Sequence, residues 1–169
     1  MQARRRQRQV RRTVRIVCEG YAEECFIKHV RSIYLERCGD LALSTKNARG
    51  KGGRHVLQHA LAPRVCAGIA DIAIFMDTDK DWDDTQRAKA KRKKIHVLES
   101  EPCLEALLLA IAGHTSTGDS ANRKRIFADR FGADAHDKNV YARNFDKATL
   151  DAARGRVPVL DRLLRLIGV

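Results

Sequence analysis

Short apolar runs along the chain predict four β-strands. Residues 14–19 are rich in β-branched side chains and are followed by Gly20. Residues 71–76 form a near-continuous apolar run, which is typical of a strand buried on both faces of a parallel sheet. Residues 41–46 and 95–98 form two shorter runs of the same kind. A small sheet is therefore expected.

Between these runs, apolar positions recur at helical spacing. Residues 23–37 place Phe26, Val30 and Ile33 on one face of a helix. Further helices are expected over residues 54–66, 86–94, 102–112, 122–131, 147–154 and 159–167, with Asp83 or Asp84 capping the second of these and Pro102 in the first turn of the third. Alternating strands and helices predict an α/β fold, with a Rossmann-like parallel sheet of about four strands flanked by helices.

The length of 169 residues suits one domain with one core. Residues 14–112 contain all the predicted strands, and residues 113–169 are expected to form a helical extension packed on the same domain. Residues 1–13 form a basic arm. Like charges in such a block repel one another, so it is expected to stay disordered until it meets a partner. A solvated tail without function is the alternative.

The charge balance narrows the class of partner. The chain has 33 Lys and Arg against 21 Asp and Glu, which gives a net charge of +12. Such an excess predicts binding to a polyanion, either nucleic acid or an anionic membrane surface. The longest apolar stretch, residues 104–112, is too short to cross a bilayer, and no secretory signal is recognisable. We therefore expect a cytoplasmic protein that does not bind membranes.

The spacing of the cysteines and histidines indicates neither a structural zinc site nor a zincin motif. The odd number of cysteines, five, without a recognisable secretory signal argues against a disulfide framework, and the lack of a Cys-x-x-Cys pair argues against a structural zinc site. His55 and His59 are four residues apart but lack the glutamate of a zincin motif, so they are interpreted as ordinary helix residues. Cys103 could be a nucleophile, but a small buried residue in an apolar helix explains it better.

Two of the predicted strands end in carboxylates. Glu19 ends the first run, and Asp77 follows the run of residues 71–76, with Asp79 two residues further on. If that strand persists, Asp77 and Asp79 point to the same side. Functional residues in parallel sheets gather at the carboxyl ends of the strands. Glu19 could join the two aspartates there if the two strands are neighbours.

Clustered carboxylates repel one another, and burying them together is costly unless a cation neutralises them. Hard oxygen ligands of this kind suit Mg²⁺ or Mn²⁺. The alternative is that residues 77–84 form a solvated turn with helix-capping aspartates.

Basic residues follow the aspartates closely in the sequence. They are Arg87, Lys89, Lys91, Arg92, Lys93 and Lys94, and later Arg123, Lys124 and Arg125. An acidic centre flanked by cations suits an enzyme acting on phosphodiesters, because the cations bind the backbone and the acids bind metal. A solvated helix face is the alternative for residues 87–94.

Three segments, in order, resemble the motifs of a known family. Residues 19–26 (Glu-Gly-Tyr-Ala-Glu-Glu-Cys-Phe) resemble the first motif of OLD-type TOPRIM domains, and Asp77-Thr78-Asp79 resembles their second, Asp-x-Asp. Residues 100–109 (Ser-Glu-Pro-Cys-Leu-Glu-Ala-Leu-Leu-Leu) are similar to the Asn-Pro-Cys-Phe-Glu-x-Trp-Leu-Leu-Leu segment of RloB-like proteins. A glycine-rich loop at residues 50–53 also falls where that family has one.

The resemblance implies a TOPRIM fold and a Mg²⁺-dependent nuclease, often associated with restriction or antiphage defence. By that likeness Glu19 is the catalytic acid or base, and Asp77 and Asp79 also take part in catalysis. Glu19, Asp77 and Asp79 hold metal, as does Glu23, the second acid of the first motif. Either Glu101 or Glu105 completes or orients a second metal. The expected contacts to nucleic acid are Arg4, Arg5, Arg6, Lys51, Arg87, Lys91, and Lys138 or Arg143 as the late basic residue.

The chain also departs from the family pattern. Glu101 stands where the family usually has Asn, so its role is ambiguous, and Leu104 and Ala106 replace the usual Phe and Trp. Two other functions stay open: a non-catalytic nucleic-acid-binding module, and another TOPRIM activity such as RNA maturation. The choice between DNA and RNA, the presence of defence-system partner proteins and homo-oligomerisation also stay open.

Overall fold

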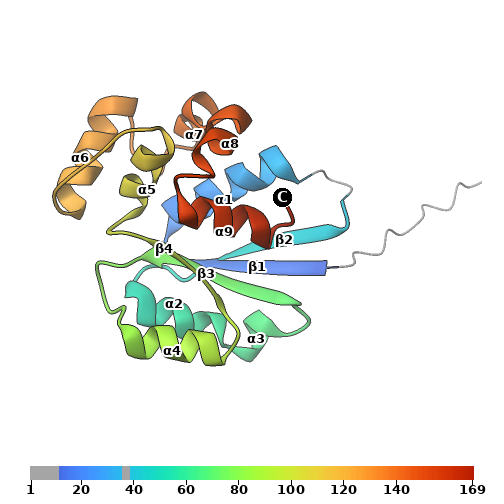
Figure 1. Cartoon of the computed structure of the whole chain (residues 1–169). Coiled ribbons are helices and arrows are strands. Elements are labelled where there is room, and N and C mark those ends of the chain that lie inside the picture. Colours follow the sequence, from blue (N-terminus) through green and yellow to red (C-terminus); the bar gives the residue numbers. More distant parts are fainter. Residues whose placement is uncertain (1–11, 36–38) are drawn as a thin grey trace, which may run out of the picture.

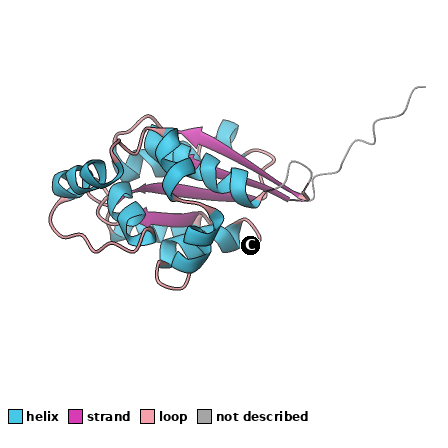
Figure 2. Ribbon diagram, turned by 90° about the horizontal axis from the view of Figure 1, so that it is seen from above, coloured by secondary structure: helices cyan, strands magenta, loops and turns pink. Residues whose placement is uncertain are grey.

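The computed structural model describes residues 12–35 and 39–169 and is built around one parallel sheet. The strands are β1 (Arg12–Cys18), β2 (Leu41–Asn47), β3 (Asp71–Asp77) and β4 (His96–Ser100). They are hydrogen-bonded in the order β2-β1-β3-β4, and every neighbouring pair is parallel (Figures 1 and 2). The expected α/β, Rossmann-like fold with about four strands is confirmed. All carboxyl ends of the strands therefore meet at one edge of the sheet.

Helices cover both faces of this sheet (Figure 1). One layer contains α2 (Gly52–Ala60), α3 (Pro63–Cys66) and α4 (Asp84–Arg92). The other contains α1 (Tyr21–Tyr34), α5 (Leu104–Ile111), α6 (Ser120–Phe131), α7 (Lys138–Asn144), α8 (Lys147–Ala153) and α9 (Pro158–Leu166). The helical segment after residue 112 thus belongs to the same layer as α1.

The sequence of β3 explains the two layers. Its side chains alternate between the faces of the sheet, so Ala73 and Phe75 join the core beneath α1 and α5, while Ile74 and Met76 join the core beneath α2 and α4. Both sets are buried, which is why the strand is apolar at nearly every position. Residues of α7 to α9, such as Tyr141, complete the first of these two cores.

Several element boundaries differ from the expectations. The predicted arm of residues 1–13 ends earlier, because Arg12 and Thr13 already belong to β1. There the Arg12 Nε donates to Asp71 Oδ2 at 2.7 Å and ties β1 to β3. The predicted helix over residues 54–66 is two helices, since α2 ends at Ala60 and Pro63 starts α3.

Two further expectations about helices were wrong. Pro102 lies before α5, whose N-cap is Cys103, so the proline is not in the first helical turn. Helix α7 was not predicted at all.

Part of the predicted nucleic-acid contact set cannot be placed. Arg4, Arg5 and Arg6 lie outside the described residues, as do Glu36, Arg37 and Cys38. In the part of the chain that the structure describes, no helix is both long enough and apolar enough to cross a membrane.

Candidate nuclease site

The order of the strands puts a topological switch point between β1 and β3. Strand β1 lies in the middle, with β2 on one side and β3 on the other, so the chain leaves β1 in one direction and later returns in the other. Ligands of open parallel sheets bind outside the carboxyl ends of the strands at such a switch point. Glu19 directly follows β1, and Asp77 is the last residue of β3. Two of the predicted acids therefore lie at this switch point.

Glu19 is fixed by the backbone around it. Its N–H donates to the Phe75 carbonyl at 2.9 Å. Its carboxylate accepts from the N–H of Gly52 on Oε1 and from the N–H of Asp77 on Oε2, both at 3.2 Å. Burial raises the pKa of Glu19, although these two N–H groups act in the opposite direction. The glutamate is thus held against the end of β3, with a carboxyl that is easier to protonate than usual.

Asp77 has the most strongly shifted pKa of the acids at this switch point. Its Oδ1 is buried and has no hydrogen-bond partner among the described residues. Burial, and then the negative charges of Glu23, Glu19, Glu105 and Asp79, raise the pKa of Asp77 to about 8. We call these five acids the carboxylate cluster.

Glu23 and Glu105 come from two helices that cover the same face of the sheet. Both are buried, at 7% and 8% exposure. Glu23 is the third residue of α1, and its Oε2 accepts from the N–H of Gly20 at 2.9 Å, which caps the helix. Burial raises the pKa of Glu23, and the charges of Glu19 and Glu105 add to the effect. Glu105 lies in the first turn of α5.

Asp79 reaches the cluster by a different route from the one expected. The strand ends at Asp77, so the premise that a continuing strand aligns Asp77 with Asp79 was wrong. Asp79 is exposed in the following turn, where its Oδ2 accepts from Ser120 Oγ at 3.2 Å. Its charge still raises the pKa of both Asp77 and Glu19. A turn anchored to the start of α6 therefore brings Asp79 close to the other acids.

Lys124 on α6 is a cation near these acids, and it was missed as a site residue. Burial alone would lower the pKa of Lys124, but the charges of Glu105, Asp77 and Asp79 outweigh that effect and raise it. The sequence showed Lys124 only as one of three consecutive basic residues. Its position became evident only from the packing of α6 against α5, which brings Lys124 near the acids.

Two uncharged polar groups lie beside Asp77. Ser100 pairs with Asp77 in the parallel register of β3 and β4, and its buried Oγ has no partner among the described residues. Cys103 is fully buried at the N-cap of α5, and burial raises its pKa to about 11. A thiol that resists ionisation is a poor nucleophile, which agrees with the interpretation of Cys103 as a buried structural residue.

Other acids of the sequence lie outside the cluster. Glu101 is exposed and lines a separate pocket together with His114 and Arg162. Glu105, not Glu101, is the acid near Asp77. Asp83 caps α4 by accepting from the N–H of Gln86 at 2.9 Å. The alternative of a capping turn therefore applies to Asp83 but not to Asp77.

The donor chemistry of the cluster fits a hard divalent cation. Within residues 12–35 and 39–169, no three His, Cys, Asp or Glu side chains are arranged to hold a metal ion as they stand. Mg²⁺, however, commonly uses one or two carboxylates and keeps several waters. Asp77 Oδ1 has no partner among the described residues, and four other carboxylates raise the pKa of Asp77, so this is an oxygen that a cation would satisfy.

The predicted phosphate-binding residues differ in their surroundings. Lys51 is exposed and adjoins Gly52, which binds Glu19, so it lies at the edge of the cluster. Arg87 is instead bound to one acid of β4 and one of its own helix, with Nε 2.8 Å from Glu99 Oε1 and Nη1 3.0 Å from Asp84 Oδ1.

The remaining predicted cations are exposed on helices. Lys91 is on α4, on the face of the sheet opposite to Glu23 and Glu105. Lys138 begins α7, two residues after His136, whose ring stacks on Tyr21 at the start of α1. Arg143 lies near the other end of α7 and donates to the Asn139 carbonyl of its own helix. Of these three cations, Lys138 lies closest in the sequence to His136, whose stacking partner Tyr21 is two residues from both Glu19 and Glu23.

No family model matches the chain, and comparisons with curated proteins and with solved structures gave no match.

Proposed function

We propose that this protein is a Mg²⁺- or Mn²⁺-dependent nuclease of the RloB type that hydrolyses phosphodiester bonds of DNA or RNA. The main support for this proposal is the environment of Asp77. A buried carboxylate oxygen without a partner, among four more acids at the switch point of a parallel sheet, costs stability unless a ligand binds there. Such groups concentrate at functional sites.

Each residue of the cluster has a role in this proposal. Asp77 and Asp79 would hold the cation, with Glu23 and Glu105 as further oxygen donors. The cation would stabilise negative charge that develops on the phosphate. Glu19, oriented by two backbone N–H groups and with a raised pKa, accepts a proton from the attacking water or donates one to the leaving oxygen. Lys124 adds positive charge beside the phosphate.

The setting of this activity is part of the same proposal. The motif order that resembles RloB-like and OLD-type TOPRIM proteins favours a role in antiphage or restriction-associated defence. The protein would act in the cytoplasm, with the net charge of +12 attracting nucleic acid.

One observation favours a second candidate function, a non-catalytic nucleic-acid-binding module. In the described part of the chain no three donors are preassembled for a metal. In that case the basic surface alone would carry the function, and the acids would have no role in cleavage.

Incubation of the purified protein with single- and double-stranded DNA and RNA distinguishes the two. Parallel reactions contain Mg²⁺, Mn²⁺ or EDTA. The nuclease proposal predicts cleavage of at least one substrate with either metal and none with EDTA. Binding of nucleic acid without cleavage under every condition would favour the binding module.

A further inference from the structure

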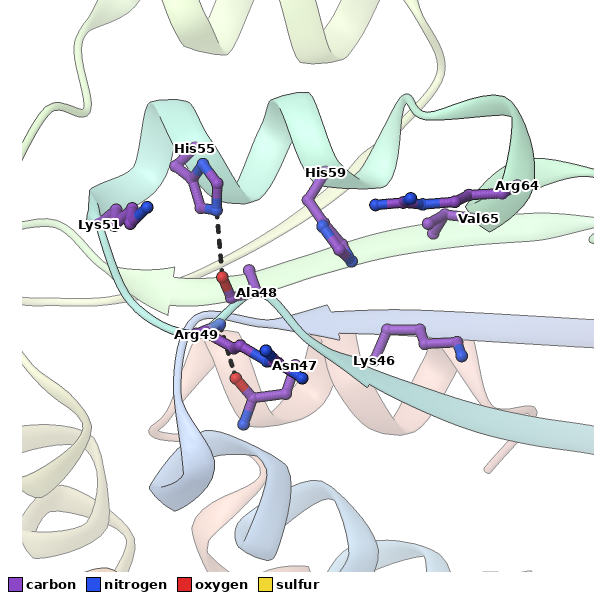
Figure 3. A pocket seen from close by; sticks show the side chains of 9 residues that line it. All are labelled: Lys46, Asn47, Ala48, Arg49, Lys51, His55, His59, Arg64 and Val65. Atoms are coloured by element: carbon purple, nitrogen blue, oxygen red, sulfur yellow. Dashed lines mark hydrogen bonds between the residues drawn. The ribbon is translucent and has the colours of Figure 1, made fainter.

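A second polar site lies beside the carboxylate cluster, on the side of β1 where β2 pairs with it. It is a pocket of about 670 Å³ between the end of β2 with its following loop and the helices α2 and α3 (Figure 3). Its polar lining is Lys46, Asn47, Arg49, Lys51, His55, His59 and Arg64. A volume within the range of about 300–1,000 Å³ suits a small ligand or one unit of a polymer.

The lining has one sign of charge. It contains four Lys or Arg side chains and two histidines, with no Asp or Glu. Among the residues that the structure describes, none of the four forms an ion pair. Burial, and then the charges of the nearby Arg64, His55 and Lys46, lower the pKa of His59. Cations gathered without a counter-charge repel one another, so an anion bound among them would relieve that repulsion.

The loop that forms one wall of the pocket is strained. Arg49 and Lys51 have φ values of 63° and 77°, and Gly50 and Gly52 are also in the left-handed region. Residues other than glycine rarely adopt this conformation, and where they do the strain commonly accompanies a binding loop. Here the strained backbone places Arg49 and Lys51 at the pocket and directs the Gly52 N–H to Glu19.

The two histidines line the pocket from one face of α2. Their ring centroids are 6.4 Å apart, and His55 Nε2 lies 3.1 Å from the Ala48 carbonyl. Because a carbonyl can only accept, His55 Nε2 carries a proton and donates there. This bond fixes the ring against the loop, as Figure 3 shows. The pocket is therefore a built cavity with oriented side chains.

The same loop joins the pocket to the carboxylate cluster. Gly50 N–H donates to the Glu19 carbonyl at 2.7 Å, and Gly52 N–H donates to its carboxylate. A strand of nucleic acid lying across this loop would have one phosphate in the pocket and a neighbouring phosphate at the acids. A pocket of this volume suits a nucleotide of a single strand rather than a duplex.

We propose that this pocket binds a phosphate group of single-stranded nucleic acid and holds the strand against Glu19 and Asp77. The ligand class rests on the proposed function, but the pocket's affinity for phosphate does not depend on cleavage. The test therefore measures binding in EDTA, where no metal-dependent step occurs.

The experiment titrates the full chain with a fluorescent single-stranded oligonucleotide at several salt concentrations. The double variant Lys46→Gln with Arg64→Gln removes two pocket cations. The matched control, Arg31→Gln with Arg162→Gln, removes the same charge from exposed positions on α1 and α9, on the other face of the sheet. Melting curves establish that both variants fold as the wild type does.

The pocket variant should lose at least tenfold in affinity. Its salt slope should fall by about 0.7 for each phosphate that the pocket no longer neutralises, while the control changes little. Equal losses in the two variants would mean that only net charge matters and would overturn the proposal. A mononucleotide that binds the wild type as tightly as the oligonucleotide would overturn the claim that a strand is bound. A pocket variant that loses affinity, in a protein that cleaves nothing, would support the pocket and refute the nuclease.

Discussion

Replacing Asp77 with Asn should stabilise the metal-free protein. Asp77 is a buried acid whose pKa is raised to about 8 by burial and by four neighbouring carboxylates. In the unfolded chain the same group ionises near its ordinary value of 3.8. The folded state therefore holds a proton that the unfolded state releases, and the free energy of unfolding falls as the pH rises from about 4 to about 8. Asparagine has a similar shape and does not titrate, so it removes this loss.

The pKa shift sets the scale of the effect. At about 1.4 kcal/mol for each pKa unit, the shift corresponds to about 6 kcal/mol as an upper limit. The Asp77 residue as a whole is only partly buried, so water screens part of the repulsion, and we expect a gain of about 2 kcal/mol at pH 8. Near pH 4 the variant and the wild type should differ little. Glu19 and Glu23 also have raised pKa values, so the variant keeps part of the pH dependence.

The assay is urea unfolding in EDTA at several pH values between 4 and 9. Asp83→Asn is the matched control, because it makes the same chemical change in the same acidic segment. Asp83 caps α4, and Asn caps about as well, so this control should show no pH-dependent gain. If Asp77→Asn is less stable than the wild type at pH 8, or if the two variants behave alike, the account of a repulsive carboxylate cluster is wrong.

Three further predictions concern Mg²⁺ binding, the side chain of Lys124 and the basic N-terminal arm. At a Mg²⁺ concentration a hundred times its Kd, the wild type should gain about 2.7 kcal/mol of unfolding free energy, and Asp77→Asn should gain almost none, measured by thermal melting. Lys124→Gln should weaken nucleic-acid binding and steepen the loss of stability with rising pH. The control is Arg125→Gln, at the neighbouring residue, which pairs with Asp129. Both variants are compared by titration with nucleic acid and by unfolding at several pH values. Deleting residues 1–11, and sparing Arg12 in β1, should reduce the salt slope for duplex DNA by about 0.9 for each phosphate that the arm neutralises and leave the melting temperature unchanged.

The sequence predicted the parts of the fold that local pattern determines. Residues 71–76 are apolar because both faces of β3 are covered, so the strand and its buried position could be recognised from the run alone. The break at Pro63 and the short helix α7 were missed. A helix of seven residues has too few turns to show a clear apolar period, and α7 depends on packing against α1.

Only those site residues that end a strand or match a family motif could be predicted from the sequence. Glu19 and Asp77 are adjacent because the strand order places β1 beside β3. By contrast, Lys124 lies near Glu105 because α6 packs against α5, and no spacing in the sequence reveals this. Likewise His55 and His59, interpreted as ordinary helix residues, line a pocket whose other wall comes from the end of β2 and the loop after it.

The most direct test of the proposed function is a cleavage assay that compares two acids. Asp77→Asn and Glu101→Gln are incubated with the substrate that the wild type cleaves, in Mg²⁺ or Mn²⁺. Asp77 lies in the carboxylate cluster, whereas Glu101 is exposed and lines a different pocket. We expect Asp77→Asn to lose cleavage by orders of magnitude while it still binds nucleic acid, and Glu101→Gln to stay close to the wild-type rate. Cleavage by Asp77→Asn at the wild-type rate would contradict the assignment of the site.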